Sequence, residues 1–182
     1  WNFDEGSGNV AGDLVGGDDN GTMTSGAWTA DGKFGSALEL GDGSKSMSVA
    51  GLAEQLKEAT ISFWIRPRSE NGEQTIIENT LWAGEINLRT IGRRFFLRSS
   101  NLDQRGLPGT SPDEFWSAGV LRMNEWNHVV FSYDLVNKVA RFYLDGSLGA
   151  ETSFASTHAL RFDQQFWVGA NFDNTGFFLD GG

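Results

Sequence analysis

The sequence predicts an all-β protein built as an antiparallel two-sheet β-sandwich, and three observations lead to this prediction. Residues 126–134 and 139–145 are rich in aromatic and β-branched residues and are joined by a four-residue turn, which is typical of a β-hairpin. Further short apolar runs follow one another without helical segments between them. The chain contains 24 glycines and only 3 prolines, a composition that suits many tight turns.

The length and composition indicate one globular domain. A chain of 182 residues can bury a two-layer core, and its 39% hydrophobic and 13% aromatic content excludes a disordered chain. The chain has no cysteine, so disulfides and thiolate metal sites are excluded. We therefore expect residues 1–182 to fold as a single domain.

The charge argues against nucleic acid as a partner. The formal net charge is −10, whereas binding to phosphates requires a positive field. This acidity is compatible with a secreted protein, with calcium binding, or with a simple solvated surface.

No run of about 18 apolar residues occurs, so we expect no membrane insertion. An extracellular or cell-surface location is the prediction.

Taken in order, the segments are mostly short strands. Residues 4–32 are dense in glycine and polar residues but carry spaced apolar anchors, which predicts a loop packed on a sheet. Residues 52–58 predict a brief helical turn. Residues 99–119 read as a long surface loop. Strands are expected at 37–40, 47–49, 60–66, 74–78, 85–90, 93–98, 126–134, 139–145 and 165–171.

The strand at residues 60–66 shows the alternation of a half-buried strand most clearly. Ile61, Phe63 and Ile65 share one face, whereas Ser62 and Trp64 share the other. One face of this strand is therefore expected to contribute to the core.

Several segments in a consistent order connect this chain to a known family. It resembles the laminin-G-like jelly-roll domains of the concanavalin A-like lectin and glucanase superfamily. The resemblance implies an antiparallel jelly roll, a fold that hosts lectins, adhesion modules, appended domains of enzymes and some glycosidases. The segments that carry it are residues 1–8, 18–22, 32–38, 60–67, 125–146, 167–170 and 177–181.

Two features of the family are missing from this chain. Members usually have several strand residues ahead of the segment beginning at Trp1, and a final strand after the segment 177–181. The resemblance therefore implies a single domain over 1–182 that lacks its outermost strand residues at both ends. Such a domain has open hydrogen-bonding edges. We expect completion by a strand from a partner chain, or a chain that is a portion of a larger protein.

The residues do not support catalysis. The resemblance implies that a retaining glucanase would carry Glu-x-Asp-x-x-Glu on a strand, and no such spacing occurs. The two histidines, His128 and His158, are too few for a histidine-rich metal site. We expect His128 to be hydrogen-bonded in or near the sheet. The prediction is that the protein is not an enzyme, with a glycan-active enzyme of unusual site as an alternative.

Calcium is the metal that the sequence favours. Residues 13–21 supply carboxylate, amide and backbone oxygens from a flexible turn, as hard cations require. The resemblance implies a structural Ca²⁺ held by Asp13, Asp18 and Asn20, with Asp42 as a further ligand. A solvated turn without metal is the alternative.

Glycan binding requires flat apolar surfaces together with planar polar groups. Trp82 and Trp116 are expected in loops, and Arg105 lies in the same long loop as Trp116. These three residues form the candidate ligand site, although loop aromatics can also fold back into small clusters. Trp64, Trp126 and Trp167 lie on expected strands and are assigned to packing.

These observations together predict a noncatalytic extracellular recognition module. Its expected partner is a glycan, as in a lectin, or a protein surface, with calcium as a structural ion. The alternative is a structural or adhesion subunit of a surface assembly or virion, which would use the fold for protein–protein contact and form homo-oligomers.

Overall fold

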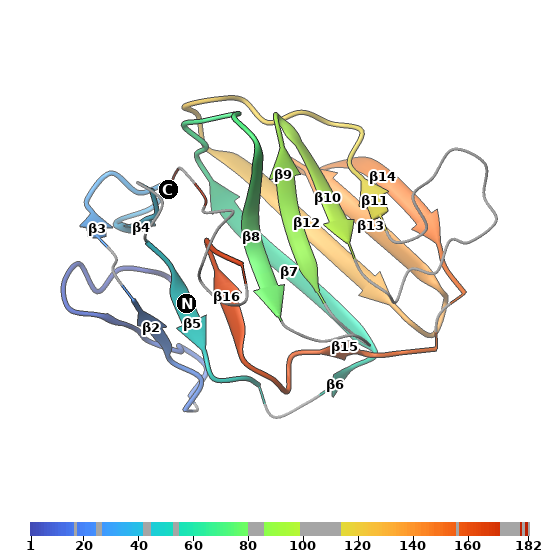
Figure 1. Cartoon of the computed structure of the whole chain (residues 1–182), viewed down its shortest axis with the longest axis horizontal. Helices are drawn as coiled ribbons and strands as arrows, with labels where there is room; N and C mark the ends of the chain where they lie inside the picture. The colour runs from blue at the N-terminus through green and yellow to red at the C-terminus, as the bar shows by residue number, and fades with distance from the viewer. Residues whose placement is uncertain are drawn as a thin grey trace.

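The structure is a computed structural model that describes residues 1–16, 18–24, 27–41, 45–52, 55–79, 86–98, 114–155, 157–171, 179 and 181. The described residues form sixteen strands, and Figure 1 shows how they are arranged. They are β1 (Val10–Ala11), β2 (Gly21–Met23), β3 (Ala27–Thr29), β4 (Ala37–Glu39), β5 (Met47–Val49), β6 (Gln55–Leu56), β7 (Glu58–Ile65), β8 (Glu73–Asn79), β9 (Asn87–Ile91), β10 (Arg94–Arg98), β11 (Glu114–Trp116), β12 (Asn127–Asp134), β13 (Val139–Leu144), β14 (Ser147–Ser153), β15 (Leu160–Arg161) and β16 (Phe166–Val168).

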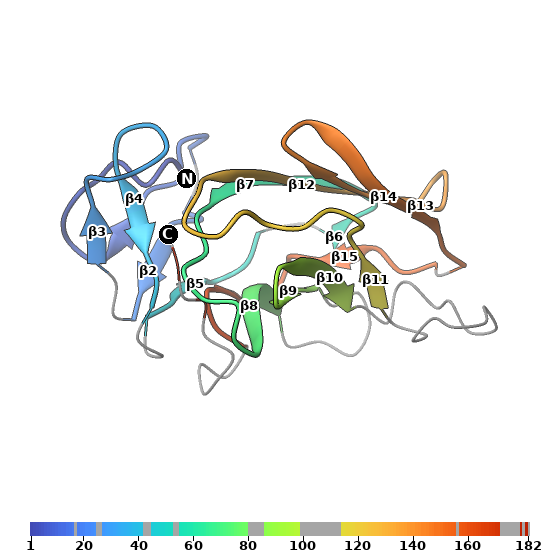
Figure 2. The ribbon, with the colours of Figure 1, turned by 90° about the horizontal axis from the view of Figure 1, so that it is seen from above.

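Two large antiparallel sheets face each other. One sheet has the order β1-β2-β5-β16-β8-β9-β10-β11, and the other has the order β14-β13-β12-β7. Figure 2 shows them as two layers, with β7 and β12 in one and β8, β9 and β10 in the other. Two small sheets, β15-β6 and β3-β4, complete the described part of the fold. The predicted all-β sandwich is confirmed.

The described residues contain no helix, and hence none long and apolar enough to span a membrane. The helical turn predicted at residues 52–58 is therefore wrong. Gln55 and Leu56 pair with β15, and the Lys57 carbonyl accepts a hydrogen bond of 2.8 Å from the Leu135 N–H. A single helical turn is a poor competitor because its nucleation is unfavourable, so pairing with distant strands prevails.

The core lies between the two large sheets. Alternate residues of β12, including Val129 and Phe131, are fully buried, as the period of a half-buried strand requires. Phe142 of β13 lies at the centre of an aromatic group. Its ring centroid is 4.9 Å from that of Phe115, 5.3 Å from that of Phe131 and 6.3 Å from that of Phe95. These rings join β10, β11, β12 and β13 across the sandwich.

The Asp-Gly pair after β13 forms a two-residue turn into β14, a strand that the sequence did not predict. Asp145 and Gly146 have φ values of 49° and 80°, as a type I′ turn requires. The Asp145 carboxylate accepts hydrogen bonds from the Arg122 guanidinium and from the His128 N–H. The bond from Arg122 is the main reason that the pKa of Asp145 is lowered. This contribution to stability is present above the ordinary aspartate pKa and is lost as pH falls through the lowered value.

Residues 4–32 are more ordered into strands than the sequence indicated, because β1, β2 and β3 lie within them. The Trp28 Nε1–H donates to the Gly8 carbonyl at 3.0 Å, and Met23 is buried. Val10, Leu14 and Val15 are exposed, so these three apolar residues do not anchor the segment to the sheet. Within residues 99–119, Glu114–Trp116 forms edge strand β11, whereas 99–113 lie outside the described residues.

Candidate functional site

The face of the eight-stranded sheet that points away from the core carries polar and aromatic side chains. Residues directly opposite each other in an antiparallel pair share a face, so the strand registers place these side chains in two cross-strand rows. Their neighbours along each strand, such as Leu88 and Leu97, belong to the core. We call this surface the polar-aromatic face. Its rows are Trp167-Glu78-Asn87-Arg98 and Thr75-Arg89-Phe96-Trp116.

A buried ion-pair cluster lies at the centre of this face. The Arg89 guanidinium donates from Nη2 and Nε to Glu78 Oε2 at 2.5 and 3.1 Å, and it also pairs with Glu73. The Arg89 and Glu78 side chains are only 7% and 4% exposed. Charges at this depth are tolerated only when they are paired and hydrogen-bonded. Arg98 Nη1 also lies 4.0 Å from Glu73 Oε1, so the cluster contains two carboxylates and two guanidinium groups.

A β-bulge explains why the two glutamates reach the same arginine. The register of β8 on β9 shifts between Thr75 and Ile77. One extra residue in a strand reverses the side on which the following side chains point. Glu78 therefore shares the face of Glu73 and Thr75, although simple alternation would place it on the opposite side.

Aromatic rings adjoin the cluster at the β10 and β11 side. Trp116 stacks on Phe96 with ring centroids 4.7 Å apart and an interplanar angle of 23°. The Arg94 guanidinium lies 5.3 Å from the Trp116 ring and donates to the Ser117 carbonyl, which holds it in place. Phe96 is fully buried beneath Trp116, which remains partly exposed. Trp116 therefore presents a flat ring that rests on Phe96 and lies beside the Arg94 guanidinium.

Two buried polar atoms on this face lack a hydrogen-bond partner within the described part of the chain. They are Thr75 Oγ1 and Asn87 Oδ1. Thr75 lies opposite Arg89, and Asn87 lies opposite Glu78. Buried polar atoms are nearly always hydrogen-bonded, so an ordered water is the expected partner of each.

Of the three predicted ligand residues, only Trp116 lies within the described residues. Trp116 lies on the polar-aromatic face, but on a strand and not in a loop. Trp82 and Arg105 lie outside the described residues. Trp167, which was assigned to packing, points to the polar-aromatic face, because it lies opposite Glu78. Sequence reasoning missed Glu78, whose signal is a charged residue within a strand otherwise rich in buried residues.

The opposite sheet carries a second aromatic group on its outer side. Trp64 is 37% exposed, so it does not belong to the core as expected. Its ring stacks on His128 at 4.9 Å, and His128 Nε2 lies 2.8 Å from Ser62 Oγ. The expectation of a hydrogen-bonded His128 in the sheet is confirmed.

The predicted calcium ligands lie partly within the described chain. Asn20 Oδ1 accepts a hydrogen bond of 2.8 Å from the Asp13 N–H, and Asp13 Oδ1 accepts one of 3.1 Å from the Val15 N–H. Asp18 is exposed, and Asp42 lies outside the described residues. The described residues contain no group of three or more His, Asp or Glu that could hold a metal. Calcium binding stays a prediction.

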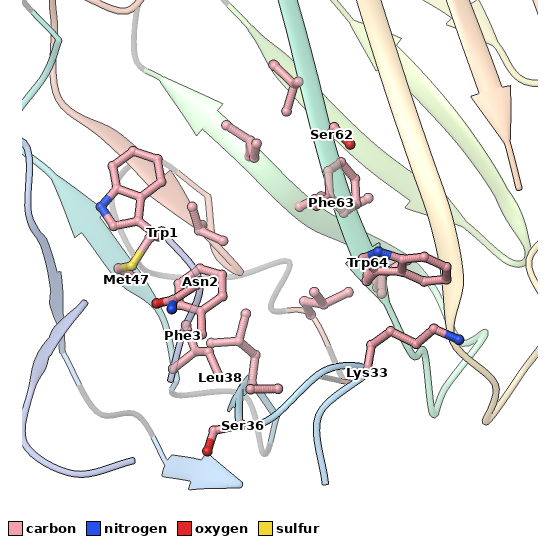
Figure 3. Close-up of a pocket in the computed structure, with 18 of the residues that line it drawn as sticks. Trp1, Asn2, Phe3, Lys33, Ser36, Leu38, Met47, Ser62, Phe63 and Trp64 are labelled. Carbon is pink, nitrogen blue, oxygen red and sulfur yellow. The ribbon is translucent and has the colours of Figure 1, made fainter. Parts of the chain in front are cut away.

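An apolar cavity of about 490 Å³ lies between the sheets beside β7. Figure 3 shows Phe63 and Trp64 of β7 on one side of it, with Trp1, Phe3 and Met47 on the other. Asp4 and Lys33 are the charged residues in its lining. A cavity with so few polar groups is a poor site for sugar hydroxyls.

Solved structures share this architecture. Domain 4 of AbnA, a GH43 extracellular arabinanase from Geobacillus stearothermophilus in complex with arabinotriose, is 18% identical with a TM-score of 0.65, over 92% of this chain and 81% of that one. The binding domain of Paraclostridial Mosquitocidal Protein 1 is 18% identical with a TM-score of 0.67, over 93% of this chain but only 41% of that one. The CBM40 of the Ruminococcus gnavus IT-sialidase, bound to α2,3 sialyllactose, is 13% identical with a TM-score of 0.57, over 87% of this chain and 85% of that one.

At these identities the structural likeness establishes the fold alone. Among curated protein sequences, none matches this chain. The family model Laminin_G_3, described as the concanavalin A-like lectin/glucanases superfamily, matches residues 40–181, which is most of the chain. The chain therefore belongs to the concanavalin A-like lectin and glucanase superfamily.

Proposed function

We propose that this protein is a noncatalytic extracellular recognition domain that binds carbohydrate on the polar-aromatic face. The observation that carries the proposal is the arrangement of partly exposed indole rings around the Arg89 cluster. Sugar recognition requires ring surfaces that cover the apolar faces of sugars and planar polar groups that bind their hydroxyls. The polar-aromatic face combines both.

The spacing of the two tryptophans favours an extended glycan over a single sugar. Trp167 is on β16 and Trp116 is on β11, with β8, β9 and β10 between them. Four strand spacings of about 4.8 Å separate β16 from β11, so Trp167 and Trp116 lie about 19 Å apart in the direction across the strands. A sugar chain lying across the strands would stack on a ring at each end and reach Asn87 and Arg98 between them.

The charged cluster supports binding more than catalysis. Both carboxylates, Glu73 and Glu78, are bound to the same guanidinium. Their oxygens are therefore engaged in fixing Arg89, whereas a glycosidase needs one carboxyl group free to donate a proton. The solved relatives with arabinotriose and α2,3 sialyllactose support a glycan as ligand, and the extracellular arabinanase supports secretion.

Removing an indole from the polar-aromatic face is expected to weaken glycan binding at least tenfold. Trp116→Ala and Trp167→Ala each remove a partly exposed ring, and the loss of a stacked anchor costs about 1.4 kcal/mol or more. Trp64→Ala is the matched control, because it removes a partly exposed tryptophan from the other sheet. Glycan-array screening with arabino-oligosaccharides and sialylated glycans, followed by calorimetric titration of the best ligand, measures the effect.

Two results would contradict this proposal. One is the absence of binding to any glycan on the array by the folded protein. The other is a ligand whose affinity falls with Trp64→Ala but is unchanged in both Trp116→Ala and Trp167→Ala, which would place the site on the other sheet.

We also propose that Ca²⁺ stabilises the turn that contains Asp13, Asp18 and Asn20, together with Asp42. Excess chelator is then expected to lower the melting temperature by several degrees, and calcium in excess over the chelator is expected to restore it. The double variant Asp13→Asn/Asp18→Asn is expected to lose this response. A melting temperature that is the same with chelator and with calcium would reject the metal site.

A further inference from the structure

Two neighbouring arginines differ from the others in their charge environment. Every arginine in the described part of the chain except Arg93 and Arg94 forms an ion pair with an aspartate or a glutamate. Acidic residues are abundant, because the chain carries a formal net charge of −10. Two adjacent guanidinium groups that have no carboxylate partner among the described residues therefore need a separate explanation.

The place of Arg94 in the sheet distinguishes it from Arg93. Arg93 lies in the turn between β9 and β10, whereas Arg94 is the first residue of β10. Arg94 precedes Phe96 by two residues, so it points to the same side of the sheet as Phe96. Its guanidinium carbon lies 5.3 Å from the centroid of the Trp116 ring. Arg94 therefore brings a cation to the polar-aromatic face, beside a partly exposed indole.

The Arg94 guanidinium is fixed on one side and open on the other. Its Nε and Nη2 atoms both donate to the Ser117 carbonyl, at 3.0 and 2.7 Å. A guanidinium has five N–H groups in a planar fork, and these two bonds use the pair nearest the side-chain stem. The pair at the far end, one N–H on Nη1 and one on Nη2, has no acceptor within the described residues. Two parallel N–H groups match the two oxygens of a carboxylate.

Ser117 is a rigid support for this guanidinium. Its side chain is buried, its N–H donates to the Phe95 carbonyl at 2.9 Å, and its Oγ accepts from the Phe95 N–H at 3.1 Å. An arginine that is already held by a fixed carbonyl loses less side-chain entropy on binding a ligand than a mobile one. Arg94 is therefore preorganised to bind an anionic group.

The acidic residue in the same cross-strand row does not compete with such a group. Glu73 lies opposite Ile91, which lies opposite Arg94. Two strand spacings, or about 10 Å, separate Glu73 from Arg94, a distance above the screening length of about 8 Å in physiological salt. The Glu73 carboxylate also lies beside the guanidinium groups of Arg89 and Arg98. Repulsion between Glu73 and an anion at Arg94 is therefore weak.

We propose that Arg94 binds the carboxylate of an acidic sugar residue that lies against Trp116, so that the polar-aromatic face selects glycans containing a uronic or a sialic acid. This inference rests on the proposed glycan-binding function and adds to it the chemistry of one ligand group. The acidic sugar occupies the end of the extended glycan at β11, which is the last strand of the eight-stranded sheet. A neutral sugar there forms only the weaker hydrogen bonds of an uncharged acceptor.

The test compares glycans that differ in one carboxylate. One pair is 3′-sialyllactose and its methyl ester, and the other is an oligosaccharide ending in glucuronic acid and its carboxyl-reduced form, which ends in glucose. In at least one pair, the acidic member is expected to bind about tenfold or more tightly in calorimetric titrations, because its hydrogen bonds to Arg94 are charge-assisted. The pair with the larger difference identifies the class of acidic sugar.

Substitutions at the two neighbouring arginines locate the carboxylate. Arg94→Gln is expected to abolish the difference between the acidic and the neutral member, whereas Arg93→Gln should leave it unchanged within about twofold. Arg93 is a matched control, because it is also exposed and its Nε also donates to a backbone carbonyl, that of Leu121. Arg94→Lys keeps the charge but lacks the planar fork, so it should retain only part of the difference.

The ratio of the two affinities separates ligand binding from mechanical support of Trp116. If Arg94 only held Ser117 and Trp116 in place, Arg94→Gln would weaken the acidic and the neutral glycan by the same factor. If Arg94 binds the carboxylate, the acidic glycan alone loses the larger part of its affinity. Circular dichroism confirms that the variants fold.

Three results would overturn the inference. One is equal affinity for the acidic and neutral members of both pairs, which would leave the proposed glycan-binding function intact. Another is an equal weakening of both members by Arg94→Gln. The last is an equal loss of the difference in Arg93→Gln and Arg94→Gln, which would indicate attraction by overall charge. The absence of binding to any glycan would instead reject the proposed function and this inference together.

Discussion

Replacing Arg89 by methionine is expected to lower the free energy of unfolding by about 3–5 kcal/mol, because the change breaks the buried ion pair with Glu78 and removes one of the two arginines beside Glu73. Glu78 is the more affected of the two, since its side chain is only 4% exposed. Methionine retains most of the apolar volume of the arginine stem, so the effect reports on charge and hydrogen bonding more than on a cavity. Urea unfolding monitored by tryptophan fluorescence measures the change.

Two further variants test whether the loss of stability is specific to the Arg89 cluster or follows from the removal of any paired arginine. Arg141→Met removes the Arg141–Glu151 pair of the other sheet, whose side chains are 34% and 50% exposed, and it is expected to cost less than about 1 kcal/mol. Adding Glu78→Gln to Arg89→Met is expected to recover part of the loss, because it removes the buried charge that has lost its ion pair with Arg89. Equal effects of Arg89→Met and Arg141→Met would show that the Arg89 cluster is not a structural centre.

The second large effect is expected at the centre of the core. Phe142→Ala should lower the free energy of unfolding by about 3–5 kcal/mol, the usual cost of removing a buried phenylalanine. Phe142 is 1% exposed and contacts three other phenylalanine rings that come from three different strands. Its removal therefore leaves a cavity that cannot close without movement in both sheets.

The matched control is Val136→Ala, at a turn residue that is 68% exposed. Its effect should remain within about 0.5 kcal/mol, as for most surface changes. Phe142→Leu should fall between the two variants, since it keeps most of the buried volume. A loss below about 1 kcal/mol for Phe142→Ala would mean that the two sheets do not depend on this aromatic group.

The strands that the sequence predicted correctly have strong local signals. The alternation of Ile61, Phe63 and Ile65 predicts both a strand and its inward face, and the structure confirms both. The hairpin of β12 and β13 was equally clear, because aromatic and β-branched residues are enriched in strands. Strand β14 was missed because Ser147–Ser153 contains few apolar residues, and its pairing with β13 alone holds it in the sheet.

The candidate site depended more on context. Trp116 was a candidate from its residue type, but its strand position and its stacking on Phe96 follow from the pairing of β11 with β10. Trp167 was assigned to packing because it lies on a predicted strand. Its true direction depends on the register with β8, which one sequence does not contain.

By itself the sequence determined the fold class, the main strands and the family, because hydrophobic periodicity and turn residues act over a few neighbouring positions. Only the tertiary structure decided which side chains meet. The bulge in β8 reverses the side on which Glu78 points, and so creates the Arg89 cluster. The bridges of Gly181 with Leu40 and Pro67 connect the segments that follow β4 and β7. Both features arise from contacts between strands that are distant in the chain, and such contacts leave no local pattern to read.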